Sequence, residues 1–142
     1  MKKGIYVAVI VAVAALVIIS LSLEPKPQRT ASYHVTLADP KLYSDGIFTD
    51  SFKIQKGSFQ FSFVPNGDSP KTLTISLKGS SFSFSEDFKL EGTPHNTGIS
   101  TYYTWNYLGT KKIELTNDQE LKIIIDPHGE ILGSVSVDLV KT

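Results

Sequence analysis

Residues 54–67 read IQKGSFQFSFVPNG, and this stretch decides the fold. Phe59, Phe61 and Phe63 occupy alternate positions, with Gln60 and Ser62 between them. Successive side chains of a β-strand point to opposite faces, so this spacing predicts a strand with one face in an apolar core and the other in solvent. Turn formers stand on both sides of the run and bound the strand, and Asn66-Gly67 after it suits a tight hairpin turn.

The same two-residue period recurs from Tyr33 onward, and turn formers separate the runs. Strands of about six residues with turns at intervals of about ten predict an all-β fold, an antiparallel two-sheet β-sandwich of about eight or nine strands. A jelly roll and a simpler sandwich both fit this pattern. A short turn is expected near residues 39–43. The runs that keep one parity are Val35 and Leu37; Phe48, Phe52 and Ile54; Leu73, Ile75 and Leu77; Phe82 and Phe84; Phe88 and Leu90; Ile113 and Leu115; Leu121, Ile123 and Ile125; and Val135, Val137 and Leu139.

The N-terminal part has a different composition. No charged residue interrupts Ile5 to Leu23, a length that spans a bilayer as a helix, and Lys2 and Lys3 before it place the N-terminus in the cytoplasm. We therefore expect a single-pass anchor over residues 1–23, a Pro-rich stalk over 24–32 and an extracytoplasmic β-sandwich domain over 33–142. A cleaved signal peptide is the alternative for the first segment, and it would export the same domain.

Charge and cysteine content exclude several classes of protein. The chain has 14 basic and 14 acidic residues, so it lacks the basic surface that nucleic-acid binding requires. It has no cysteine, which excludes disulfides, thiolate metal sites and a cysteine nucleophile. We expect no cofactor.

Catalytic chemistry has little support in the sequence. Histidines at 34, 95 and 128 and many serines are available, but no Gly-x-Ser-x-Gly elbow exists and no strand-turn-helix could hold one. Asp126, His128 and Glu130 sit at alternate positions and are weak candidates for a calcium, zinc or copper site. The favoured interpretation is a β-turn between a strand that ends at Ile125 and a strand that begins near Ile131, in which Asp126 accepts backbone hydrogen bonds.

One aromatic segment could form a binding face. Tyr103, Trp105 and Tyr107 share one side of a strand, and aromatic faces bind sugars or proteins. Packing in the core is the favoured alternative for Trp105. Tyr102 has the opposite parity and is the natural exposed candidate. The full candidate face comprises Tyr102, Tyr103, Trp105, Tyr107, His95 and Asn96.

The run at residues 54–67, together with the closing run DPHGEILGSVSV at residues 126–137, resembles the GOLD-type β-sandwich of secretory-pathway cargo receptors. The resemblance covers most of residues 47–140 as a strand pattern and implies a sandwich that binds proteins without catalytic groups. Those receptors differ in placing the membrane helix after the domain and in carrying a disulfide. The resemblance therefore implies no role for any particular residue.

Two functions remain open at this point. One is a non-enzymatic binding module, held at the membrane by Ile5 to Leu23, that recognises an envelope protein or a glycan. The other is a structural subunit of a pilus-like filament or cell-surface layer. Pro25 and Pro27 end the hydrophobic helix at the membrane surface, whereas pilin helices continue into the head, so the binding module is favoured.

Overall fold

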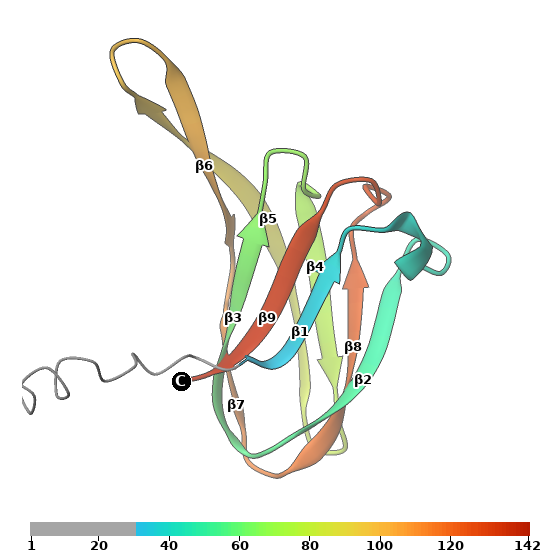
Figure 1. Ribbon diagram of the computed structural model, residues 1–142. Coiled ribbons are helices and arrows are strands. Elements are labelled where there is room, and N and C mark those ends of the chain that lie inside the picture. The colour runs from blue at the N-terminus through green and yellow to red at the C-terminus, as the bar shows by residue number, and fades with distance from the viewer. Residues whose placement is uncertain (1–30) are drawn as a thin grey trace, which may run out of the picture.

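The computed structural model describes residues 31–142, and these residues form an antiparallel β-sandwich of two sheets (Figure 1). A short 3-10 helix, η1 (Pro40–Leu42), lies in the turn expected near residues 39–43. The anchor and the stalk predicted for residues 1–32 lie almost entirely outside the described residues. Within those residues, no helix has the length and hydrophobicity needed to cross a membrane. The strands are β1 (Ala31–Leu37), β2 (Phe48–Ile54), β3 (Gly57–Pro65), β4 (Thr72–Lys78), β5 (Ser83–Asn96), β6 (Thr101–Leu108), β7 (Lys112–Leu115), β8 (Gln119–Asp126) and β9 (Val135–Lys141).

The strand pairing is nested. One sheet has the order β1-β9-β3-β7, and the other has the order β2-β8-β4-β5-β6. The first described strand thus pairs with the last, the second with the eighth and the third with the seventh, while β4 and β5 form the innermost pair. Strand β6 is added beside β5 at the end of the five-stranded sheet. The chain therefore folds as a rolled ribbon of strand pairs with one extra strand.

The core lies between the sheets and is filled by the alternating apolar residues. Phe59 and Phe61 on β3 are buried, and Phe61 packs edge-on against Phe88 of β5, with 5.5 Å between the ring centroids. The two-residue period thus gave the correct inward face. Burial of these side chains provides the main stabilisation, at about 25 cal/mol for each Å² of apolar surface removed from water.

One connection differs from its sequence prediction. Asn66-Gly67 suits a tight hairpin turn, but residues 66–71 cross from one sheet to the other, because β3 pairs with β7 and β9 rather than with β4. Ser69 fixes this loop: its Oγ accepts the N–H of Asn66 at 2.9 Å and donates to the carbonyl of Ser134. The loop before β4 is therefore tied to the loop before β9.

Candidate functional site

The β5–β6 hairpin extends beyond the sandwich (Figure 1). Strand β4 begins at Thr72, opposite Lys89 of β5, so β5 continues past β4 from Leu90 to Asn96 with only β6 beside it. We call this segment, residues 90–108, the projecting hairpin. Its tip carries Ile99, which is 98% exposed. Figure 1 shows the hairpin at one end of the molecule, and the start of β1 lies toward the other end.

One face of the projecting hairpin is the continuation of the sheet face that packs in the core of the sandwich. Tyr103, Trp105 and Tyr107 lie on this face of β6, opposite Pro94, Gly92 and Leu90 of β5. Tyr107 is fully buried, so it does not belong to an exposed face as the sequence had suggested. Tyr103 is 54% exposed, because β6 has left the sandwich by that point. We call Tyr103 and Trp105 the aromatic face.

Trp105 is not the core residue that the sequence favoured. Its side chain is 36% exposed and packs on the backbone of two glycines instead of between the sheets. A Cβ atom at Gly92 would lie 2.7 Å from the indole, and one at Gly67 would lie 3.4 Å from it. The ring therefore joins the projecting hairpin to the β3–β4 loop while one part of it stays in solvent.

Tyr107 fixes the base of the projecting hairpin. Its hydroxyl donates to the carbonyl of Pro70 at 2.6 Å in the β3–β4 loop. Burial raises the pKa of this phenol well above its usual range near 10, because the phenolate would lose its hydration. Phe63 packs against the same ring, with the centroids 5.1 Å apart. Tyr107 is thus an anchor, and the residues beyond it are free to bind.

The opposite face of the projecting hairpin carries Tyr102, which is 53% exposed, as its parity predicts. Its ring stacks on His95, the residue directly across the ladder, with 4.9 Å between centroids. His95 Nε2 lies 2.8 Å from Thr104 Oγ1. Asn96, the last candidate residue, accepts the N–H of Gly98 at 2.8 Å and shapes the turn. Only four of the six candidates therefore present rings to solvent or to one another on the hairpin: His95, Tyr102, Tyr103 and Trp105.

Asp126, His128 and Glu130 do not converge. The Asp126 carboxylate accepts the N–H of His128 at 2.8 Å, which confirms the expected turn. The Glu130 carboxylate instead accepts a hydrogen bond from the backbone N–H of Lys71, at 2.6 Å. The turn has positive φ at His128 and Gly129. In residues 31–142, no three His, Asp or Glu side chains gather in a way that could hold a metal ion. The strand that follows begins at Val135, later than the position near Ile131 that was predicted.

A second polar cluster lies on the outer face of the four-stranded sheet. His34 Nδ1 is 2.5 Å from Asp138 Oδ1, and His34 Nε2 is 3.2 Å from Thr36 Oγ1. The first contact connects the neighbouring strands β1 and β9, in which His34 lies directly opposite Asp138, and the second lies within β1. A hydrolase additionally needs donors placed around a developing oxyanion and a bound substrate beside the hydroxyl. Here the His34 side chain is 57% exposed on a sheet surface, so the cluster is cross-strand pairing.

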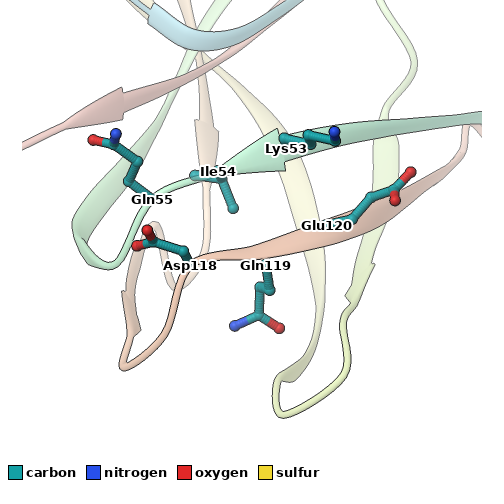
Figure 2. A pocket seen from close by; sticks show the side chains of 6 residues that line it. All are labelled: Lys53, Ile54, Gln55, Asp118, Gln119 and Glu120. Atoms are coloured by element: carbon teal, nitrogen blue, oxygen red, sulfur yellow. The ribbon is translucent and has the colours of Figure 1, made fainter.

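One hollow, of about 430 Å³, lies where β2 ends and β8 begins. Lys53, Ile54, Gln55, Asp118, Gln119 and Glu120 line it. Figure 2 shows that Gln119 points to the opposite side from Lys53 and Glu120, which are paired across the two strands. The Asp118 carboxylate already accepts a hydrogen bond from the backbone N–H of Lys56, at 2.8 Å. The hollow therefore offers no convergent set of groups for a ligand, and the projecting hairpin remains the candidate site.

Comparisons with models of protein families, with curated proteins and with solved structures find no match for this chain.

Proposed function

We propose that this protein is a membrane-anchored, extracytoplasmic β-sandwich module that binds a protein or glycan partner through its projecting hairpin and performs no catalysis. The observation that carries the proposal is the exposure of Tyr103 and Trp105 on a hairpin that extends beyond the core. Tyrosine and tryptophan dominate the energy of binding interfaces, because each combines a large apolar ring with a polar tip.

The electrostatics of the hairpin support a partner recognised by apolar contact. Between Gly92 and Leu108 the sequence contains no Asp, Glu, Lys or Arg. The depletion of charged residues and the enrichment of aromatic ones are the compositional features that distinguish the centre of an interface from the remaining surface. The aromatic face has both features.

The direction of the first described strand supports the same role. Ala31 starts β1 opposite Val140, whereas Leu37 at the other end of β1 lies opposite Val135, where the β8–β9 loop ends. The projecting hairpin leaves the sandwich near that loop, since Lys71 beside it pairs with both Leu90 and Glu130. An anchor preceding Ala31 would therefore hold the hairpin at the end farther from the bilayer, where a partner can reach it.

We also infer that the sandwich is of the jelly-roll type. The nested pairing of β1 with β9, β2 with β8, β3 with β7 and β4 with β5 is the pairing of a rolled eight-stranded ribbon, and β6 is an addition to it. Jelly rolls include many lectin and coat domains, so this topology suits both binding and assembly.

A filament or surface-layer subunit is the second candidate, and one observation favours it. Among residues 31–142, strand β6 is an uncharged strand at the edge of its sheet, and such edges pair with further strands. An adhesive role and an assembly role therefore share the same hairpin.

The proposal is tested by binding of the full-length protein, kept in detergent, to envelopes of the cells that produce it. The variant carries Tyr103→Ser and Trp105→Ser, and the control carries Val64→Ser, which removes a 64% exposed apolar side chain from the sandwich body. We expect the amount of double variant retained on the envelopes to be at least tenfold lower than that of wild type, and the amount of the control to stay within about twofold of wild type. Equal retention of all three proteins would refute the proposal.

A further inference from the structure

Strand β6 differs from the other edge strands of the two sheets. Strand β2 carries Asp50 and Lys53, β7 has only four residues with Lys112 and Glu114 among them, and β1 contains a register shift between Ala31 and Tyr33. Charges, short length and bulges are the usual devices that keep a sheet edge from pairing with another chain. Strand β6 runs for eight residues with no charged residue and no proline.

The backbone groups at this edge can be assigned from the hydrogen bonds around it. The N–H of Thr97 donates to the carbonyl of Ser100 at 2.9 Å within the hairpin, whereas the N–H of Leu90 donates away from β6, to the carbonyl of Lys71. Bonded and non-bonded pairs alternate along an antiparallel ladder. The N–H and C=O groups of Tyr103 and Trp105 therefore point outward, to the free edge.

Pro94 agrees with this assignment. It lies opposite Tyr103, and it has no N–H to donate. A proline is tolerated there because the pair belongs to the non-bonded set. The hydrogen bonds within the hairpin are thus accounted for, and in the part of the chain that the structure describes no strand lies beside the outward backbone groups of Tyr103 and Trp105.

We propose that a second copy of this chain adds its own β6 to this edge, antiparallel and centred on Thr104. This inference rests on the proposed function and names the partner. The register is self-complementary, because it places Tyr103 of each copy opposite Trp105 of the other, on one face of a continuous sheet. The two pairs exchange about four backbone hydrogen bonds. Aromatic pairs directly across a ladder add to the stability.

The two-fold arrangement has a consequence for the membrane. The strands run in opposite directions, so the two sandwich bodies lie at opposite ends of the joined hairpins. The Ala31 ends then point apart. Copies held in two facing membranes can pair in this way, and the protein would act as a homotypic bridge between surfaces.

A charge-reversal pair tests the register. Thr104 is exposed and meets itself at the centre of the interface, whereas Thr93, its partner on β5, is about three strand spacings, or ~14 Å, from its own copy. We compare full-length Thr104→Glu and Thr104→Lys, singly and mixed, with Thr93→Glu and Thr93→Lys as controls. Analytical ultracentrifugation in detergent measures the dimer dissociation constant, and turbidity measures bridging of vesicles that carry the protein.

The wild type should dimerise with a dissociation constant between about 1 μM and 1 mM, the range of small interfaces. Each single Thr104 variant should weaken the dimer by about tenfold or more, since like charges face each other, and a mixture of the two should restore it. The Thr93 variants should resemble wild type. A wild type that stays monomeric, or Thr104 variants that dimerise normally, would overturn the inference. If envelope binding nevertheless depends on Tyr103 and Trp105, the partner is a different molecule and only the proposed function survives.

Discussion

Trp105 lies directly opposite Gly92 in the β5–β6 ladder, and its indole covers the bare backbone of the glycine. A side chain at position 92 would enter the volume of the ring, with its Cβ 2.7 Å from the nearest ring atom. The glycine therefore sets the orientation of the tryptophan, and with it the shape of the aromatic face.

Gly92→Ala should displace the indole toward solvent. Trp105 is the protein's single tryptophan, so intrinsic fluorescence reports on this site alone. We expect emission of the variant to shift to longer wavelength and binding through the hairpin to weaken, with a loss of stability of about 1 kcal/mol. Thr93→Ala, the next residue along β5 and on the other face, is the control and should leave the spectrum unchanged. An unshifted spectrum for Gly92→Ala would mean that the ring does not rest on the glycine.

Truncation should separate the anchor from the exposed ring. Tyr107→Ala removes a fully buried ring between the sheets and should cost about 3–5 kcal/mol. Trp105→Ala acts on an element outside the core and should cost no more than about 1 kcal/mol. Urea unfolding followed by far-ultraviolet circular dichroism measures both. Equal costs would show that the hairpin is part of the cooperative core.

Alkaline pH should destabilise the fold through its buried phenols. Burial raises the pKa of Tyr107, and of Tyr33 beside Asp50, above the unfolded value near 10. The raised pKa stabilises the fold below pH 10, and this contribution is lost as the pH rises above it, because the unfolded state then releases protons that the folded state retains.

The Tyr107→Phe variant tests this dependence. It loses the hydrogen bond to Pro70 and should be about 1–2 kcal/mol less stable at pH 8. Its melting temperature should fall less steeply than that of wild type between pH 9 and pH 11, while Tyr102→Phe at an exposed position serves as the control. Parallel slopes for wild type and Tyr107→Phe would contradict the assignment.

The sequence predicted the sandwich well because burial imposes a strict period. Runs such as Leu121, Ile123 and Ile125 can pack in only one way on a sheet, so parity alone identifies the inward face. Connections were less predictable. Asn66-Gly67 has the composition of a hairpin turn, but which sheet receives the next strand depends on pairings with residues more than sixty positions away.

The arrangement of the candidate residues could be predicted only in part, for a related reason. Parity correctly grouped Tyr103, Trp105 and Tyr107, but it carries no information on where a strand leaves the core. Tyr107 stays between the sheets and Tyr103 does not. The length of β5 relative to β4 decides this, and the long run without charges between Gly92 and Leu108 was the available signal.

Orientation at the membrane is a further expectation. Full-length protein should stay with membranes in high salt, and protease added to intact cells should remove the β-sandwich domain, since Lys2 and Lys3 precede the hydrophobic run. The same digestion after cell lysis is the control, and a cytoplasmic marker protein reports whether the cells were intact. A mature chain that starts near Leu23, or protection of the domain in intact cells, would contradict this topology.

The most direct test of the binding role is site-specific cross-linking in intact cells. A photoreactive residue replaces Tyr103 on the aromatic face or, as the control, Ser85, whose hydroxyl pairs with that of Ser76 on the sandwich body. We expect a discrete cross-linked product from position 103 and none from position 85. Cross-links from position 85 with none from position 103 would contradict the proposed binding role.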